Sequence, residues 1–191
     1  VRGTVKMAAF QFIETPIEDL LLIETEVFAD SRGSFQETFR QDAFSHAGIS
    51  LDFVQDNQSR SIRNVLRGLH FQRKKPQGKL VRAVLGEIYD VAVDLRQDSS
   101  TYGQWHGVRL SRENRRQFYL PPGFAHGFLT LSREAIVLYR CTDYYDGQDQ
   151  GGICWNDPTL NIQWPLSGEA PILSDKDLQN QTFAAYQEST K

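Results

Sequence analysis

Few cysteines, no long hydrophobic run and no surplus of positive charge are the first features of this sequence of 191 residues. The two cysteines, Cys141 and Cys154, are too few for a disulfide framework and lack the C-x-x-C spacing of a zinc or redox motif. The longest strongly apolar runs, residues 20–23 and 135–138, fall far short of the ~18 residues that a membrane-spanning helix requires. We therefore expect a cytoplasmic protein with no membrane segment and no membrane partner.

Positive charge is outnumbered by negative charge. The chain has 21 Lys and Arg against 24 Asp and Glu, which gives a formal net charge of -3 and a pI near 5.8. No overall basic field is available to hold a nucleic-acid duplex. We expect no nucleic-acid partner, and an anionic ligand must be bound by a local cluster of cations.

Motifs for cofactors and metals are absent as well. The sequence has no P-loop, no G-x-G-x-x-G and no G-x-S-x-G, so nucleotide hydrolysis, dinucleotide redox chemistry and serine-hydrolase chemistry lack a motif. The four histidines, His46, His70, His106 and His126, occur singly, without the spacing of a metal site. We expect neither a metal nor another cofactor.

The overall composition is typical of one folded domain. Hydrophobic residues make up 40% of the chain and charged residues 24%, and the length suits a single domain over residues 1–191. Because Met7 is the only methionine, we interpret residues 1–6 as an addition to the natural chain and leave them aside. Short segments alternate apolar and polar residues, which is the period of half-buried strands. The expected strands are 22–28, 52–58, 65–72, 79–85, 87–95, 107–110, 117–120, 125–131 and 135–145, with Gly86 closing a hairpin between two of them.

Helical patterns are confined to residues 41–46 and 175–187. In the second segment Ser174 is a suitable N-cap, and Leu178, Phe183 and Tyr186 are the apolar positions. About ten closely spaced strands without a longer repeat predict a mainly β, single-domain fold, a β-sandwich or barrel of the jelly-roll kind with short peripheral helices.

The densest polar cluster covers residues 63–72 and continues to Lys79. On a straight strand Arg67 and His70 point to opposite faces, so a shared site requires a bend or bulge, for which Gly68 is the obvious place. The alternative is a His70 that only satisfies its hydrogen bonds on a half-buried strand.

Three other clusters have both a functional and a structural interpretation. His126 follows a Pro-Pro-Gly turn and enters an apolar strand, where a buried imidazole needs a hydrogen-bond partner whether it is functional or not. Tyr139 and Tyr145 share one face of a regular strand, which packing alone also explains. Turn and helix-cap chemistry explains the charged segments 30–37 and 174–177 equally well.

Specific strings of residues extend over nearly the whole chain. They are Asp-x-Arg-Gly-x-Phe-x-Glu (30–37), Phe-Val-Gln-Asp-Asn (53–57), Val-Leu-Arg-Gly-Leu-His (65–70), Gln-Gly-Lys-Leu-Val-Arg (77–82), Asp-Val-Ala-Val-Asp-Leu-Arg (90–96), Pro-Pro-Gly-Phe-Ala-His-Gly-Phe (121–128), Trp-Asn-Asp-Pro (155–158) and Leu-Ser-Asp-Lys-Asp (173–177). In content and order they resemble the dTDP-4-dehydrorhamnose 3,5-epimerase family. The resemblance implies a metal-free cupin jelly roll, usually a homodimer, that inverts C3 and C5 of a dTDP-4-keto-6-deoxyhexose.

The resemblance also implies roles for individual residues. His70 is expected to be the general base, Tyr139 the general acid on the opposite face of the sugar, and Lys79 a cation near the C4 oxygen. The carboxylate partner of the base lies in the 174–177 string, where we favour Asp177 over Asp175. The implied substrate contacts are Arg32, Phe35, Glu37, Gln55, Asp56, Asn57, Arg67, Lys79, His126 and Tyr145.

Residue chemistry agrees with these implied roles. Removing a proton beside a ketone produces an enolate, so the site needs a base that titrates near neutrality and a cation or donor at the developing oxyanion. A carboxylate behind the imidazole fixes its tautomer and stabilises the imidazolium. A phenol is protonated at pH 7 and supplies a proton from the other face.

Two positions depart from the family pattern. Phe71 stands where the family commonly has Tyr, and Gln150 stands near a common acidic contact to the ligand. Substrate preference, and inversion of both carbons rather than one, therefore stay open at this point. The remaining alternative, a non-catalytic sugar-nucleotide-binding cupin, has no reason to retain the base, the acid and the oxyanion cation together.

Overall fold

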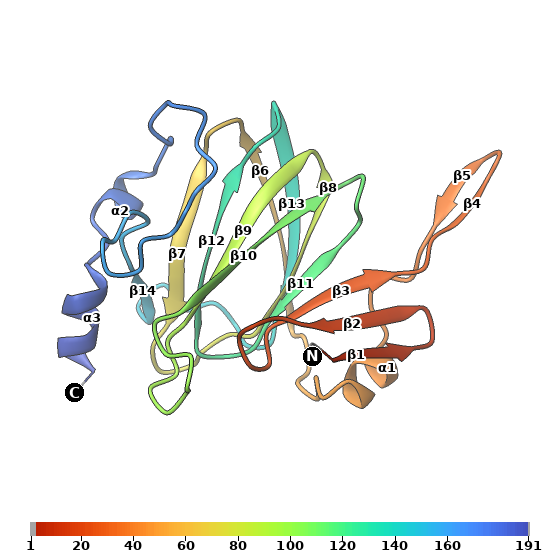
Figure 1. The fold of residues 1–191 in the computed structure, drawn as a ribbon, viewed down its shortest axis with the longest axis horizontal. Coiled ribbons are helices and arrows are strands. Elements are labelled where there is room, and N and C mark those ends of the chain that lie inside the picture. The colour runs from red at the N-terminus through yellow and green to blue at the C-terminus, as the bar shows by residue number, and fades with distance from the viewer. Residues whose placement is uncertain (1–2, 191) are drawn as a thin grey trace.

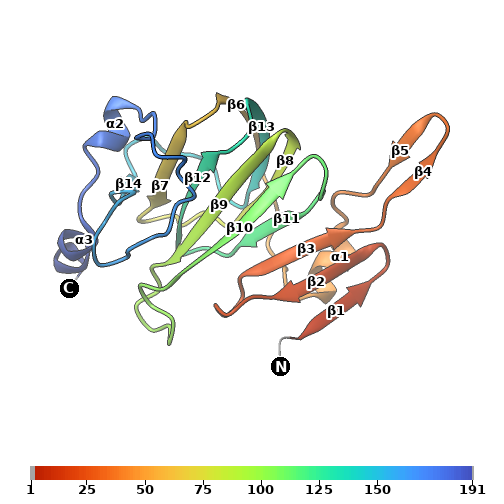
Figure 2. The same ribbon diagram turned by 45° about the horizontal axis from the view of Figure 1, so that its top comes forward.

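The computed structural model describes residues 3–190 of the chain. Its strands form two antiparallel sheets that face each other, while a separate hairpin projects away from them and short helices lie at the periphery (Figure 1). The view in Figure 2 shows α2 and α3 beside the smaller sheet, and the projecting hairpin at the opposite end of the molecule. The predicted mainly β jelly-roll architecture is confirmed.

The larger sheet has the strand order β1-β2-β3-β11-β8-β13-β6. Its strands are β1 (Thr4–Met7), β2 (Phe10–Glu14), β3 (Leu21–Thr25), β11 (Gln117–Leu120), β8 (Lys79–Leu85), β13 (Glu134–Cys141) and β6 (Gln55–Ile62). The smaller sheet, β10-β9-β12-β7-β14, contains β10 (Trp105–Ser111), β9 (Glu87–Asp94), β12 (Phe124–Thr130), β7 (Leu66–Gln72) and β14 (Gln150–Gly152). The projecting hairpin pairs β4 (Phe28–Asp30) with β5 (Gly33–Phe35), and the helices are α1 (Gln41–His46), α2 (Asp175–Leu178) and α3 (Phe183–Ser189).

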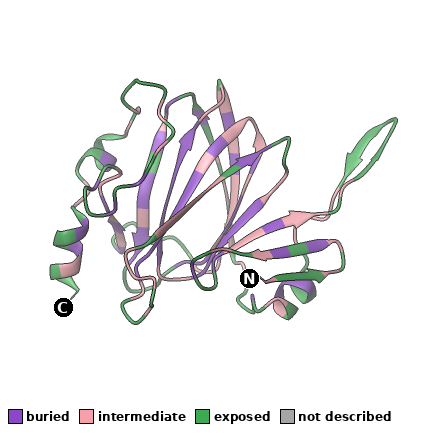
Figure 3. Ribbon diagram, viewed as in Figure 1, coloured by how far each residue is buried: buried purple, intermediate pink, exposed green. Residues whose placement is uncertain are grey.

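Side chains from both sheets fill the space between them. Val137 of the larger sheet and Phe128 of the smaller sheet belong to one buried cluster. The other face of the smaller sheet is also covered, because Leu69 and Val91 pack with Phe183 of α3. Burial on both faces explains why β12 is buried along its whole length, whereas the projecting hairpin is exposed throughout (Figure 3).

The single helix predicted for residues 175–187 is wrong. Two short helices, α2 and α3, are separated at Gln181, which forms a parallel bridge with Ile153 and accepts the backbone N–H of Cys154. Pairing with a distant segment therefore overrides the local helical pattern. Phe183 is buried as expected, but Leu178 is 65% exposed because α2 ends there, and so no continuous apolar face forms.

The hairpin predicted at Gly86 is also wrong. β8 and β9 belong to different sheets, and Gly86, with a φ of +68°, turns the chain from one sheet to the other. A Cβ atom at this position would lie 2.0 Å from the backbone oxygen of Glu134, so the corner leaves no room for a side chain.

Several strands lie outside the predicted segments. The expected strand 22–28 divides into β3 and β4, and β1, β2, β5 and β14 were not predicted. Residues 4–6, which the sequence argument left aside, belong to β1. No helix among the described residues has the length and apolar character needed to cross a membrane.

Candidate active site

A bulge in β7 brings two predicted site residues to the same face. In the pairing of β7 with β12, His70 lies opposite His126 and Arg67 lies opposite Phe128, so two residues of β7 match one residue of β12. Gly68, with a φ of +133°, occupies this bulge, and a Cβ there would lie 2.5 Å from the Cα of Gly127. The predicted bulge at Gly68 is confirmed, and it lets His70 and Arg67 both reach toward the larger sheet, where Nε of the exposed Arg67 donates to Oγ of Ser61 on β6 at 3.0 Å.

His70 is held by a buried carboxylate from the C-terminal segment. Its Nε2 atom lies 2.5 Å from Oδ1 of Asp177, and the Asp177 side chain is only 4% exposed. Burial opposes ionisation of Asp177, but hydrogen bonds from His70, Ser174 and Asn180 outweigh it and lower the carboxyl pKa. The structure therefore gives His70 an ionised carboxylate partner and leaves its second ring nitrogen free of this contact.

The opposite wall carries the phenol and the ammonium group. Tyr139 and Cys141 on β13 lie beside Asn57 and Gln55 on β6, and Cys141 is paired in register with Lys79 on β8. Burial raises the pKa of Tyr139, so its phenol keeps its proton at neutral pH. Burial lowers the pKa of Lys79, which makes its ammonium group a stronger acid.

These two walls enclose a cavity of about 260 Å³ that opens between the sheets. His70 lies on the smaller-sheet wall, and Lys79 and Tyr139 lie on the larger-sheet wall. The complete lining is Gln55, Asn57, His70, Phe71, Gln72, Gln77, Lys79, Tyr139, Cys141, Tyr145 and Gln150. We call this cavity the site pocket.

His126 lies beside the site pocket and has the partner that its burial requires. Its Nε2 atom lies 3.0 Å from both carboxylate oxygens of Asp90, which is fully buried. Burial lowers the pKa of His126 even though Asp90 favours the charged form. Asp90 also interacts electrostatically with Lys79, so this carboxylate links a neutral imidazole to the ammonium group of the opposite wall.

Asp90→Ala should destabilise the protein measurably. It leaves the buried His126 ring without its hydrogen-bond partner, and an unsatisfied buried polar group costs about 1–3 kcal/mol. Urea unfolding followed by circular dichroism measures the loss, with Asp175→Ala on exposed helix α2 as the control for removal of a carboxylate. A loss below about 0.5 kcal/mol would show that His126 does not depend on Asp90.

The mouth of the site pocket contains one of the two departures from the family pattern. Oε1 of Gln150 accepts hydrogen bonds from the Tyr145 hydroxyl at 2.7 Å and from Nζ of Lys176 at 2.5 Å. Phe71 only borders the pocket, since its ring packs 5.1 Å from the ring of Tyr186 on the other side of the sheet. Gln150 is therefore the departure placed to affect a ligand.

The structure does not bring every predicted site residue to the pocket. Arg32 and Phe35 lie on the projecting hairpin and are strongly exposed; the Arg32 side chain is 88% exposed and forms an ion pair with Asp30 at 2.6 Å. Glu37 follows the same hairpin. Figure 1 shows this hairpin projecting away from the two facing sheets, and none of its residues lines the site pocket of its own chain.

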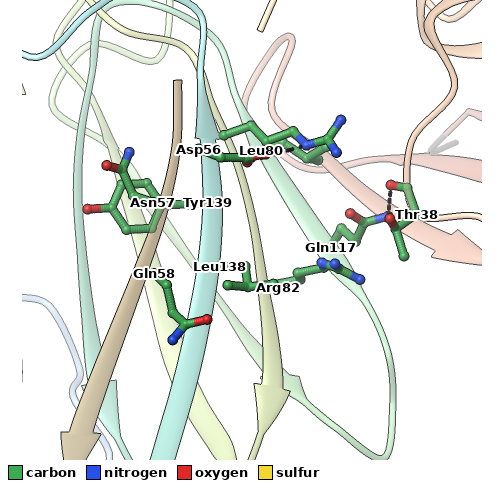
Figure 4. Close-up of a pocket in the computed structure, with 10 residues that line it drawn as sticks. Thr38, Asp56, Asn57, Gln58, Leu80, Arg82, Gln117, Leu138 and Tyr139 are labelled. Atoms are coloured by element: carbon green, nitrogen blue, oxygen red, sulfur yellow. Dashed lines mark hydrogen bonds and ion pairs between the residues drawn. The ribbon is translucent and has the colours of Figure 1, made fainter. Parts of the chain in front are cut away.

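Asp56 lies on the outer face of the larger sheet. Its carboxylate lies 3.4 Å from Nε of Arg140, in a shallow pocket that also contains Arg82 and Gln117. Figure 4 shows Asn57 and Tyr139 on one side of the sheet and Arg82 and Gln117 on the other. Alternation along β6 thus directs Gln55 and Asn57 inward and the intervening Asp56 outward.

The sequence argument missed several residues that hold the site together. Asp90 occurs in one of the quoted strings, and the expectation that His126 needs a partner was the only signal for it. Ser174 was expected only as a helix cap, a role that the structure confirms. Nothing in the local sequence marks Asn180, which contacts the site from another segment.

Among residues 3–190 no three His, Cys, Asp or Glu side chains gather in a way that could hold a metal ion.

Comparisons with known proteins identify the family. The family described as dTDP-4-dehydrorhamnose 3,5-epimerase matches residues 14–185. A dTDP-4-dehydrorhamnose 3,5-epimerase of Methanothermobacter thermautotrophicus is 58% identical over 172 residues, which cover 90% of this chain and 93% of the relative.

Two solved structures are informative. The dTDP-6-deoxy-D-glucose-3,5-epimerase of Legionella pneumophila, in complex with dTDP-4-keto-L-rhamnose, has a TM-score of 0.88 and 49% identity, covering 91% of this chain and 92% of that chain. ChmJ, a 3'-monoepimerase of Streptomyces bikiniensis in complex with dTDP-quinovose, has a TM-score of 0.86 and 32% identity, covering 92% of this chain and 89% of that chain. Because the family match and the similar relative each cover most of its length, the chain belongs to the dTDP-4-dehydrorhamnose 3,5-epimerase family.

Proposed function

We propose that this protein is an isomerase that inverts C3 and C5 of dTDP-4-keto-6-deoxy-D-glucose to give dTDP-4-dehydro-L-rhamnose. The observation that supports it best is the pairing of His70 and Asp177 on one wall of the site pocket with Tyr139 on the other. A sugar ring held between these walls meets a base on one face and a proton donor on the opposite face, which is the requirement for inversion at carbon. The match to the family and to its 3,5-epimerase members supports the same substrate class.

Proton removal is the role we assign to His70. Both C3 and C5 neighbour the C4 ketone, so loss of either proton produces an enolate at the C4 oxygen. Asp177 orients the imidazole and stabilises the imidazolium that forms when the proton arrives. His70 thereby becomes positively charged at the moment when the substrate becomes negatively charged.

We assign stabilisation of the enolate and its reprotonation to Lys79 and Tyr139 on the opposite wall. Lys79 provides a positive charge and an acidic N–H for the C4 oxygen, and its lowered pKa makes that proton easier to share. Tyr139 then donates its phenolic proton to the carbon from the face opposite His70. Arg67 is close enough to Tyr139 to stabilise the phenolate that remains.

Product analysis tests this function. The enzyme is incubated with dTDP-4-keto-6-deoxy-D-glucose, and ¹H NMR coupling constants report the configuration at C3 and C5. Inversion at both carbons is expected. Inversion of one carbon would instead identify a monoepimerase, the activity named for the related ChmJ. Binding of the sugar nucleotide without any inversion would identify a non-catalytic binding protein and contradict the proposal.

We also propose that the protein is a homodimer in which the hairpin of one copy completes the site pocket of the other. Arg32 and Phe35 are among the residues implied to contact the nucleotide, yet their hairpin projects away from the two facing sheets of its own chain (Figure 1). Phe28 and Phe35 are 53% and 66% exposed there, which is costly for large apolar side chains that stay in water. A second copy of the chain would cover these apolar side chains and bring the hairpin residues to a nucleotide.

We also propose a cytoplasmic location, which is supported by the free thiols of Cys141 and Cys154.

A mixing experiment tests the shared site. His70→Ala and Arg32→Ala enzymes, each weak alone at low substrate, should regain activity when unfolded and refolded together. About half of the refolded dimers then contain one chain of each variant. In each of these, one site has both His70 and Arg32 and the other has neither, so the recovered rate should be about a quarter of the wild-type rate. A mass of one chain by light scattering, or no recovery in a confirmed mixed dimer, would contradict the shared site.

A further inference from the structure

The carboxylate that holds His70 is itself held by Ser174. The Ser174 hydroxyl donates a hydrogen bond to Oδ2 of Asp177 at 2.9 Å and accepts one from the Asp177 backbone N–H at 3.1 Å. The second bond is the N-cap of α2, which starts directly after Ser174. The first is independent of the cap and fixes the carboxylate oxygen that does not face His70. Ser174 thus sets both the backbone and the side-chain orientation of Asp177.

Asn180 contacts the same pair from the other end of α2. Its Nδ2 atom donates to the backbone oxygen of Gly68 at 3.3 Å, within the bulge that turns His70 toward the site pocket. Its backbone N–H donates to the backbone oxygen of Asp177 at 3.4 Å, and its side chain lies close enough to lower the pKa of the Asp177 carboxyl group. The backbone of Gly152 approaches the same amide closely, because a Cβ added to Gly152 would lie 1.9 Å from Oδ1 of Asn180. Asn180 therefore contacts both the strand that carries His70 and the residue whose carboxylate binds the His70 ring.

We propose that Ser174 and Asn180 are positioning residues for proton abstraction, which act by fixing the Asp177 carboxylate and the Gly68 bulge against the His70 ring. The inference rests on the proposed function, since it concerns the base of that reaction. Neither residue lines the site pocket, so neither is expected to touch the substrate. A carboxylate held on its far oxygen cannot rotate away when His70 becomes charged.

Other charged groups near the pair come from three elements. Lys79 on β8 lines the site pocket, His126 on β12 lies beside it, and Lys176 on α2 bonds Gln150 at its mouth. None of these groups is bonded to Ser174 or Asn180, so variants of the two residues leave them in place. Removing a donor from Asp177 concentrates negative charge on the carboxylate, which raises the proton affinity of the imidazole–carboxylate pair.

Ser174→Ala and Asn180→Ala test the proposal, with Ser174→Thr as the conservative variant that keeps the hydroxyl. In each Ala variant kcat should fall about 10-fold to 100-fold, the effect expected when a hydrogen bond to a charged group is lost, while KM changes less than about twofold. The acid limb of the kcat/KM profile should move to higher pH. Ser174→Thr should restore most of the rate and the wild-type pH profile.

Thr182→Ala is the matched control. Thr182 caps α3 by accepting the Ala185 N–H at 3.2 Å. The Thr182→Ala variant therefore loses a helix-capping hydrogen bond like that of Ser174 and leaves Asp177 unchanged. An enzyme with Ser174→Ala whose kcat and pH profile match those of Thr182→Ala would overturn the proposal. So would a loss in Ser174→Ala that Ser174→Thr does not restore although circular dichroism shows a folded protein.

A spectroscopic measurement without substrate separates this inference from the proposed function. The ring N–H proton between His70 and Asp177 should resonate far downfield in the ¹H NMR spectrum of the wild-type enzyme, disappear in His70→Ala, shift or broaden in Ser174→Ala and Asn180→Ala, and stay unchanged in Thr182→Ala. An unshifted resonance in both Ala variants would refute positioning even if the enzyme is an epimerase. A shifted resonance in an enzyme that inverts neither carbon would refute the proposed function alone.

Discussion

His70→Ala should abolish both epimerisation and the exchange of substrate protons with solvent. No other histidine lines the site pocket in the described residues, and Nε2 of His126 is committed to Asp90, whose two carboxylate oxygens both lie 3.0 Å from it. Loss of a general base lowers the rate roughly 10²- to 10⁴-fold. Deuterium uptake from D₂O and product formation, measured together by ¹H NMR, should fall by the same factor because both require the first proton transfer.

Two histidine variants serve as references for this experiment. His46→Ala, at an exposed position of helix α1, should behave as wild type. His126→Ala should weaken binding and turnover but keep measurable exchange. If His126→Ala lost exchange and His70→Ala kept it, the roles assigned to the two residues would be reversed.

Tyr139→Phe should separate exchange from inversion. The variant keeps His70, Asp177 and Lys79, so the enolate still forms, but no phenol is left to protonate it from the other wall. His70 can trade its proton with solvent and return deuterium to the original face, which labels the carbon with retained configuration. Product formation should fall roughly 10²- to 10⁴-fold while exchange changes much less.

The ratio of inversion to exchange is the quantity to measure for Tyr139→Phe. Removal of the hydroxyl barely alters the aromatic ring, so a packing role for Tyr139 predicts little change in either rate. An enzyme that still inverts C5 near the wild-type rate would make Tyr139 a packing residue and leave the acid to be found elsewhere.

Local pattern predicted the strands of the two facing sheets better than their connections. β8 and β11 match the expected segments because one or both of their faces are buried, and the other predicted strands match to within a few residues. The strands β1, β2 and β14 were not predicted. The turn at Gly86 was read as a hairpin because a positive φ suits both a hairpin and a corner between sheets, and only packing decides between them. The break between α2 and α3 depends on Gln181 pairing with Ile153, a contact that no local window contains.

For the site too, local pattern predicted the residues on the strands better than the contacts between distant segments. His70, Lys79 and Tyr139 share the site pocket because β7, β8 and β13 carry them inward, and the bulge at Gly68 was predictable from the need to place Arg67 and His70 together. The position of the β4–β5 hairpin was not predictable, because its residues resemble an ordinary charged turn. Asp90 and Asn180 were missed for a related reason: their partners lie on other segments, and nothing in their own surroundings distinguishes them from structural residues.

Solvent deuterium labelling of the wild-type reaction tests the central claim, that a base and an acid on opposite walls of the site pocket invert carbon through an enolate. The enzyme is incubated with dTDP-4-keto-6-deoxy-D-glucose in D₂O, and NMR locates the label in the product. One deuterium at C3 and one at C5, each at an inverted centre, is the predicted result. A product inverted at both carbons that contains no solvent deuterium at either would show that the configuration changes without proton exchange at His70 and Tyr139, and would contradict the account.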